Sequence, residues 1–219
     1  MGARLTERRA PAGAILAGGQ AARLGGVAKG LLEVGGARMI DRVANALRPI
    51  VHEIVIVSGA PDAASWLRGA RVIRDLLTGG GSAAGIHAAI TATARDVLVV
   101  AWDMPFVTER ALREITRRRE DEKTSDGQPI AAVVPSHANG MLEPLCAWYD
   151  RPCADAIAAS WDEGDRSAHG IVHRVHATIV PASVYDAIGG TARVFFNVNT
   201  SSDLDEARRI ADDAPGPAA

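Results

Sequence analysis

A glycine-rich, basic loop at residues 16–30 constrains the fold of this chain more than any other segment. It contains five glycines, with Arg23 and Lys29 at fixed places among them. The apolar run 14–17 leads into it and is typical of a buried strand, so the loop would leave a sheet at the edge where α/β proteins bind ligands. Glycine lets the backbone approach a ligand closely, and the two cations suit a polyphosphate. The segment therefore predicts a nucleotide-binding loop.

Two common nucleotide-binding patterns do not fit this loop. The P-loop pattern G-x-x-x-x-G-K-[ST] fails because Ala28 stands before Lys29 and Gly30 stands after it. The dinucleotide pattern G-x-G-x-x-G is not matched either. These mismatches disfavour a P-loop ATPase and a dinucleotide-binding protein. A glycine cluster by itself would fit a flexible surface turn equally well.

Composition favours one enzyme-sized domain without a broad basic surface. With 47% apolar residues, 219 residues can bury one sizeable core. We expect the domain to span 13–211, between a disordered lead at 1–12 and a disordered tail at 212–219. Lysine and arginine number 24 against 26 acidic residues, so we expect neither nucleic acid nor a membrane as a partner. Cys146 and Cys153 suit a reduced, cytoplasmic setting, and no segment resembles a signal peptide or a membrane span.

Strand and helix patterns alternate along the chain, which is typical of a parallel α/β sheet. We expect strands at 14–17, 54–57, 72–73, 97–101, 130–134, 145–148 and 192–196. Helices are expected at 39–47, 62–67, 83–93, 109–119 and 154–161, with a last helix that Ser202 or Asp203 caps and that runs to residue 210. The pattern predicts a single-domain, three-layer, Rossmann-like α/β fold with a mostly parallel central sheet.

Two acidic residues follow expected strands. Asp75 comes after the strand at 72–73, and Asp103 comes after the strongest central-strand candidate, 97–101. Ligand sites of α/β proteins form at the carboxyl ends of parallel strands, so Asp103 is the leading candidate for a metal ligand. A second glycine turn, 79–82, precedes a helix, where backbone amides can receive an anion or a base edge.

The ordered series L-A-G-G-x-x-x-R-x-G-G-x-x-K-G at 16–30 resembles the opening of the nucleotidyltransferases that build molybdopterin dinucleotides. It is most similar to the molybdenum cofactor guanylyltransferases, the MobA family. The turn 143–145 (E-P-L), the G-x-R element at 164–166 and the ending F-x-N-x-N-T-x-x-D-L at 195–204 resemble further elements of that family. The resemblance covers both ends and the centre of the chain, and it implies a nucleotidyltransferase fold.

The resemblance also implies roles for single residues. The residues implied in catalysis are Arg23, Lys29 and Asp103, with Asp103 as the Mg²⁺ ligand. Those implied in nucleotide binding are Leu16, Ala17, Gly18, Gly19, Lys29, Ser58, Asp75, Gly81 and Asp103. Those implied on the side of the acceptor are Glu143, Pro144, Arg166, Asn197 and Asn199. Ser58 replaces a common asparagine, Trp102 replaces a small residue or cysteine, and G-S-A-A-G at 81–85 replaces G-P-L-A-G.

The implied reaction transfers GMP from GTP to the terminal phosphate of molybdopterin and releases pyrophosphate. The nucleophile is already an anion, so no strong general base is needed; positioning and charge neutralisation by Lys29, Arg23 and Mg²⁺ suffice. Family likeness further implies transient contacts with proteins that insert the cofactor or receive it.

Three alternatives stay open. A cytidylyl or sugar-1-phosphate nucleotidyltransferase would use the same loop, lysine and aspartate. A non-catalytic nucleotide-binding relative should lose Lys29 or Asp103, and this chain has both. GTP is favoured over CTP because this chain reads L-A-G-G where the cytidylyl relatives typically read L-A-A-G, which leaves room for a purine at Gly18.

Overall fold

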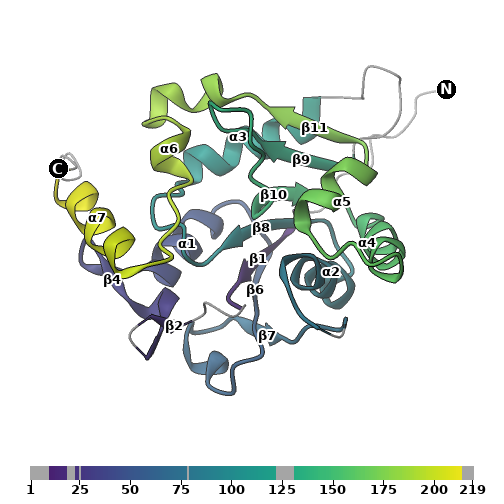
Figure 1. Cartoon of the computed structure of the whole chain (residues 1–219), viewed down its shortest axis with the longest axis horizontal. Helices are drawn as coiled ribbons and strands as arrows, with labels where there is room; N and C mark the ends of the chain where they lie inside the picture. Colours follow the sequence, from purple (N-terminus) through teal and green to yellow (C-terminus); the bar gives the residue numbers. More distant parts are fainter. Residues whose placement is uncertain (1–9, 19–22, 25, 78, 122–130, 214–219) are drawn as a thin grey trace.

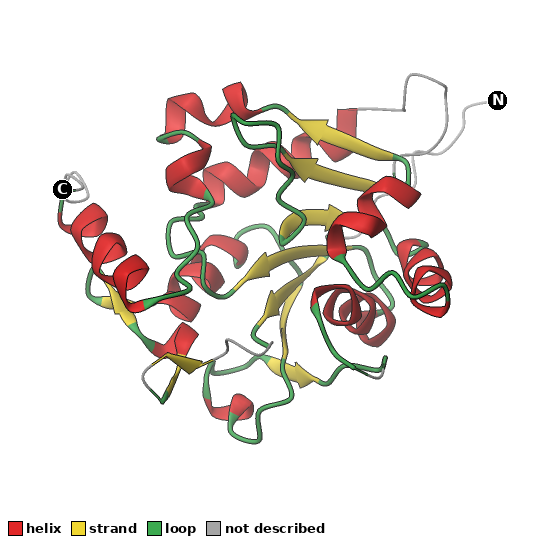
Figure 2. Cartoon of the chain, in the orientation of Figure 1, coloured by secondary structure: helices red, strands yellow, loops and turns green. Residues whose placement is uncertain are grey.

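A seven-stranded sheet forms the centre of the molecule (Figures 1 and 2). The computed structural model describes residues 10–18, 23–24, 26–77, 79–121 and 131–213. The strands of the sheet, in spatial order, are β11 (Ala177–Val180), β9 (Ala132–Pro135), β10 (Cys146–Tyr149), β8 (Val97–Ala101), β1 (Ala12–Leu16), β6 (Glu53–Val57) and β7 (Arg71–Ile73). Strand β10 is antiparallel to both of its neighbours, and the other adjacent strands pair in parallel. The expected mostly parallel α/β sheet is confirmed.

Helices cover both faces of this sheet (Figure 2). The α-helices are α1 (Met39–Leu47), α2 (Ser82–Thr93), α3 (Glu109–Asp121), α4 (Cys153–Asp162), α5 (Ala168–Arg174), α6 (Thr191–Val194) and α7 (Ser201–Asp212). The 3₁₀ helices are η1 (Lys29–Leu31), η2 (Ala63–Ser65) and η3 (Ala182–Ile188). Two small antiparallel pairs join β2 (Arg23–Leu24) to β3 (Val27–Ala28) and β4 (Glu33–Val34) to β5 (Ala37–Arg38). No helix in these described ranges is long and apolar enough to cross a membrane.

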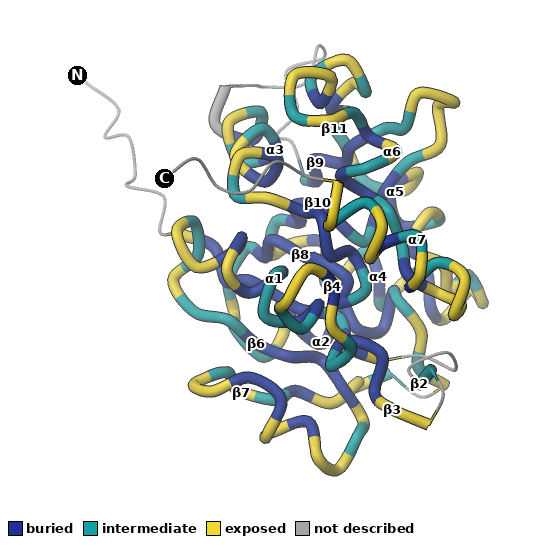
Figure 3. The backbone as a smooth tube through the Cα atoms, turned by 90° about the vertical axis from the view of Figure 1, so that its left-hand side faces the viewer, coloured by how far each residue is buried: buried dark blue, intermediate teal, exposed yellow. Residues whose placement is uncertain are grey.

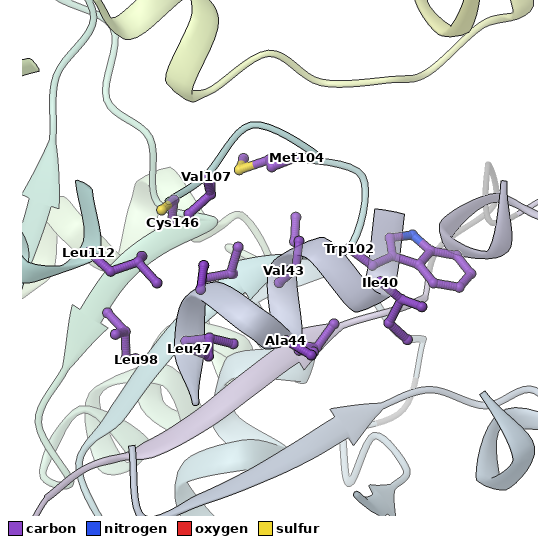
Figure 4. Close-up of a cluster of buried hydrophobic side chains, with 14 of the residues drawn as sticks. Ile40, Val43, Ala44, Leu47, Leu98, Trp102, Met104, Val107, Leu112 and Cys146 are labelled. Carbon is purple, nitrogen blue, oxygen red and sulfur yellow. The ribbon is translucent and has the colours of Figure 1, made fainter. Parts of the chain in front are cut away.

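The core has two main layers because successive residues of a strand point to opposite faces. Ile15 of β1 packs with side chains of α1 and α3, whereas its neighbour Ala14 packs with those of α2, α4 and α5. Figure 4 shows part of the first layer, where Leu98 and Trp102 pack with α1. Burying one such leucine or isoleucine stabilises the fold by roughly 1.5–3 kcal/mol. Strands that are apolar on both faces therefore require helices on both sides.

A third, smaller cluster ties the C-terminal helix to the N-terminal part of the chain. Val34 of β4, Val198 and Leu204 of α7 are buried together there. Figure 1 shows β4 beside α7, and Figure 3 shows both from the side. This contact brings the segment 197–199 next to the loop that carries Lys29.

The register of the three central strands aligns their carboxyl ends. Leu16 of β1 pairs with Val57 of β6 and with Ala101 of β8. The residues that follow each strand therefore emerge at one edge of the sheet. Positions 17–18, 58–59 and 102–103 meet there.

The expected elements differ from the structure at several places, and α5 and η3 were among those not expected. Residues 192–196 form no strand: 191–194 form α6, and Phe195 packs edge-on against Tyr185. The helix expected at 62–67 is only the short η2. Thr200, not Ser202 or Asp203, is the N-cap of α7, although Asp203 completes its capping box. Strand β11 was not expected.

Candidate active site

A cavity of about 530 Å³ opens at the carboxyl ends of β1, β6 and β8. Strand ends, the start of α2 and the segment before α7 contribute its walls. The lining residues are Leu16, Gly18, Val57, Ser58, Gly59, Asp75, Gly81, Ser82, Gly85, Ala101, Trp102, Asp103, Leu145, Asn197 and Asn199. Its volume falls within the range of about 300–1,000 Å³ that is typical of small-molecule sites.

A buried ion pair stands beside this cavity. The Lys29 Nζ lies 2.6 Å from Asp103 Oδ2 and donates a hydrogen bond to Asn199 Oδ1 at 3.0 Å. The Lys29 side chain is 3% exposed and that of Asp103 is 14% exposed. Residues from the N-terminal loop, the end of β8 and the C-terminal segment therefore meet at one ammonium group.

Close packing between Gly30 and Trp102 positions the two ends of this ion pair. A Cβ on Gly30 would overlap the indole of Trp102. Trp102 is buried, stacks on Trp66 with ring centroids 5.1 Å apart, and donates its backbone N–H to Leu16 O. The residue after Lys29 is thus held against the residue before Asp103.

One carboxylate oxygen of Asp103 is left without a partner. Its Oδ1 atom is buried and accepts no hydrogen bond from the described residues. Such an oxygen is costly to bury, and a cation would supply the missing partner. No group of three or more metal-binding side chains occurs within the described part of the chain. A single carboxylate fits a Mg²⁺ ion that takes its other ligands from substrate phosphates and water.

Most of the expected nucleotide-binding residues line the cavity. Leu16, Gly18, Ser58, Asp75 and Gly81 all line it. The Ser58 Oγ accepts a hydrogen bond from Ala60 N at 3.2 Å. Burial raises the pKa of the Asp75 carboxyl above its ordinary value.

Of three further members of the predicted loop, the structure describes only Ala17 completely. Ala17 is buried, donates its N–H to Val57 O at 2.9 Å and does not line the cavity. Gly19 lies outside the described residues. The backbone of Arg23 lies in β2, which precedes β3 and Lys29 in the chain. The side chain of Arg23 is not among the parts of the chain that the structure describes.

Four of the five expected acceptor-side residues divide into two groups. Asn197 and Asn199 line the cavity. Glu143 and Pro144 lie behind it: Glu143 is buried, contacts His137 Nε2 at 3.3 Å and accepts from the N–H of Leu145, which itself lines the cavity. Burial raises the pKa of the Glu143 carboxyl. The structure therefore gives Glu143 a supporting place behind the wall.

Arg166 lies on the side of the second glycine turn. Its guanidinium sits 4.8 Å from the centre of the Trp161 ring, and a Cβ on Gly79 would be 2.8 Å from its Nη1. It is not among the lining residues of the cavity, whereas Asn197 and Asn199 are.

Sequence reasoning assigned no role to several lining residues. Ser82 opens α2, and Gly85 lies one turn later, where a Cβ would be 3.2 Å from Leu16 Cδ2. The run of glycines before a helix was the available signal, because it predicts a close approach of the helix to β1. Nothing in the local pattern of Gly59 marked it as a lining residue, and Leu145 was singled out only as part of the turn 143–145 that resembles the family.

Comparison with known proteins identifies the family. The model of the MobA-like NTP transferase domain matches residues 13–179. The chain belongs to this family. It is a nucleotidyltransferase, and the resemblance read from its sequence motifs is confirmed. Enzymes of this class generally use a divalent metal.

Relatives with similar lengths carry a more specific name. A probable molybdenum cofactor guanylyltransferase of Pelotomaculum thermopropionicum is 38% identical over 92% of this chain and 94% of its own length. The molybdenum cofactor guanylyltransferase of Desulfosudis oleivorans is 31% identical over 89% of this chain and 93% of its own.

Solved structures agree on the fold. Molybdopterin-guanine dinucleotide biosynthesis protein A of Archaeoglobus fulgidus superposes with a TM-score of 0.75 at 30% identity, over 93% of this chain and 100% of its own. A 2-C-methyl-D-erythritol 4-phosphate cytidylyltransferase of Thermus thermophilus superposes with a TM-score of 0.62 at 18% identity, over 93% and 99%. The second likeness concerns the fold alone.

Proposed function

We propose that this chain transfers GMP from GTP to the terminal phosphate of molybdopterin and releases pyrophosphate. The observation that carries the proposal is the meeting of Lys29, Asp103 and Asn199 at the edge of the cavity. The names of the relatives support the choice of substrates. The product would pass to proteins that insert or receive the cofactor.

Positioning and charge carry the proposed chemistry. The Lys29 ammonium would bind phosphate oxygens of GTP and neutralise charge that develops on the leaving pyrophosphate. Asn199 already accepts a hydrogen bond from Lys29, so its side chain would orient that ammonium. The attacking phosphate is an anion, and the site needs no general base.

The residues present fit a Mg²⁺ ion. Asp103 would hold it through Oδ1, the oxygen that lacks a hydrogen-bond partner. When bound, the ion would add positive charge beside the triphosphate. Lys29 would then share Asp103 with the metal, and both cations would face the same phosphates.

Gly18 would determine which nucleotide base the site accepts. A Cβ on Gly18 would meet nothing nearer than Val57 O, at 4.0 Å, so the space above this residue is open to a large base. On the other side of the base we place Gly81, with Asp75 nearby.

The residues on the acceptor side would come from the C-terminal half of the chain. Asn197 and Asn199 would contact the acceptor, and Glu143 would hold Leu145 at the cavity wall. Arg166 is proposed to bind the phosphate of the acceptor.

Product analysis tests this proposal. The full chain is incubated with molybdopterin, Mg²⁺ and GTP, CTP or ATP in turn, and kcat/KM is measured with mass detection of the dinucleotide. We expect a clear preference for GTP. Equal values, or a preference for CTP, would overturn guanylyl transfer and leave nucleotidyl transfer standing.

A further inference from the structure

A second concavity, of about 440 Å³, lies at the segment that follows Asp103, and we call it the groove. It shares no lining residue with the first cavity. Its walls come from β5 and α1, from residues 105–109 that lead into α3, and from η3 and α6. The lining residues are Ala37, Arg42, Asn45, Ala46, Pro105, Phe106, Val107, Thr108, Glu109, Ile188 and Arg193.

Two arginines meet at one aromatic ring in this groove. The guanidinium carbons of Arg42 and Arg193 lie 5.9 and 5.5 Å from the centre of the Phe106 ring. Arg42 donates to Pro105 O at 2.8 Å and to Val34 O at 3.1 Å, and these bonds fix its direction. Cation–π contacts leave the outer N–H donors of a guanidinium available to a ligand.

Glycines at two turns make room for these side chains. A Cβ on Gly189 would be 3.1 Å from Arg193 Cδ, and a Cβ on Gly35 would be 3.3 Å from Arg42 Nη1. Both glycines have positive φ, +105° and +58°. The backbone therefore packs closely against both arginine side chains. Because these side chains are already restricted, they would lose little conformational entropy on binding a ligand.

The positive charge of this groove is not balanced locally. Neither arginine forms an ion pair with a described carboxylate; the acid on the rim, Glu109, is paired with Arg113 at 2.6 Å. Burial, and the charge of Arg193, lower the pKa of the Arg42 guanidinium. The positive N-terminal end of α3, a helix of 13 residues, adds to the same field.

We propose that this groove is a second anion-binding site, which takes a phosphate-type oxyanion through Arg42 and Arg193. The two forked guanidiniums suit a tetrahedral oxyanion with several acceptor oxygens. The site lies against the active site: Phe106 packs edge-on against Phe196 at 6.1 Å, and Phe196 precedes the cavity-lining Asn197.

Calorimetric titration of the full chain tests the proposal. The Lys29→Ala chain serves as background because it lacks the cation that we place on GTP phosphates, and inorganic phosphate is the probe. We expect saturable binding with a Kd on the order of 1 mM. Adding Arg193→Gln should weaken it at least about tenfold, since a charge-assisted contact is lost. Arg117→Gln, which removes an exposed charge elsewhere on α3, is the matched control and should leave Kd within about twofold.

The outcomes are decisive in either direction. The side chain of Arg193 makes no hydrogen bond to the described residues, so Arg193→Gln should fold normally, and thermal unfolding checks this. Equal phosphate binding with and without Arg193→Gln, or no saturable binding in the Lys29→Ala background, would overturn the site. A parallel titration with pyrophosphate identifies which anion the groove takes. If pyrophosphate binds more tightly than phosphate and the difference depends on Arg193, the ligand is a diphosphate group. If the two anions bind with equal affinity, the ligand is free phosphate.

Discussion

Two ion pairs of this chain are almost equally buried and differ in how completely they are satisfied. In the pair Lys29–Asp103 the side chains are 3% and 14% exposed, and in Arg119–Asp150 they are 7% and 13% exposed. Asp150 Oδ1 accepts from Arg119 Nε at 2.7 Å and from Trp148 Nε1 at 2.6 Å, and its other oxygen contacts Arg119 Nη2. Asp103 instead keeps Oδ1 without a partner.

Burial alone therefore does not distinguish a structural ion pair from a functional one. The pair Arg119–Asp150 joins α3 to the end of β10, neither residue lines a cavity described above, and both oxygens of Asp150 have a partner. The pair Lys29–Asp103 stands at a cavity and has an oxygen left to bind a ligand. We expect the first pair to contribute to stability and the second to catalysis, because an unsatisfied buried oxygen has a cost that a ligand can remove.

Breaking the structural pair should have the largest effect on folding. Arg119→Met leaves the Asp150 carboxylate buried without its main partner, so the free energy of unfolding should fall by about 3–5 kcal/mol. Urea denaturation measures this loss. Arg117→Met, at an exposed pair, should cost less than about 1 kcal/mol. A loss below about 1 kcal/mol in Arg119→Met as well would remove the distinction between the pairs.

Breaking the functional pair should act on turnover. Asp103→Asn keeps the size of the side chain and removes its charge, so kcat for guanylyl transfer should fall by more than about a hundredfold. The chain should stay folded, but its thermal midpoint should fall, because the buried Lys29 ammonium loses its charged partner and keeps its hydrogen bond to Asn199. Asp162→Asn, at an exposed acid, is the control with normal turnover. Near-normal turnover of a folded Asp103→Asn chain would contradict the assignment.

A comparison of Lys29→Ala with Arg166→Ala tests which cation acts on which substrate. Lys29→Ala should weaken GTP binding by at least about tenfold, because it removes a charge-assisted contact. Arg166→Ala should cost less in GTP affinity and should raise KM for molybdopterin. Titrations with each substrate separate the two. Arg166 lies beside Gly79. If Arg166→Ala weakened GTP binding and left KM for molybdopterin unchanged, Arg166 would instead be assigned to nucleotide binding.

The smallest effect is expected at the cap of α7. Thr200 caps this helix, and Asp203 accepts from the backbone N–H of both Asn199 and Thr200, at 2.9 and 2.8 Å. Thr200→Ala should lower the free energy of unfolding by about 1 kcal/mol. If Asn199 orients Lys29 as proposed, kcat should fall slightly in the same variant. Chemical denaturation gives the first quantity and steady-state kinetics the second.

Local pattern predicted the elements whose apolar residues face the core, and it failed where tertiary contacts decide. The strands β1, β6 and β8 are short apolar runs between polar turns. The run 192–196 looks the same, yet Phe195 and Phe196 pack against rings from elsewhere in the chain, and the segment before them coils into α6. Strand β11 is partly exposed and is held by its pairing with β9, which no local signal reveals.

The site was predictable to the extent that strand ends define it. Residues after β1, β6, β7 and β8 had to meet at one edge, which placed Gly18, Ser58, Asp75 and Asp103 together. The contact between Lys29 and Asn199 depends on how α7 packs on β4, and residue patterns do not contain that packing. The family resemblance suggested only that Asn199 borders the active site. The meeting of Arg42 and Arg193 at Phe106 has the same origin and was not foreseen.

The close packing of Gly30 on Trp102 restricts how this enzyme can change by single mutations. Any side chain at position 30 collides with the indole, which costs about 1–3 kcal/mol, and removal of the indole alone leaves a void that costs about 3–5 kcal/mol. Each single step therefore disturbs the Lys29–Asp103 pair before the second step can restore it. Positions 30 and 102 must therefore change together. A mutant library that varies them one at a time would miss the combinations that keep the enzyme active.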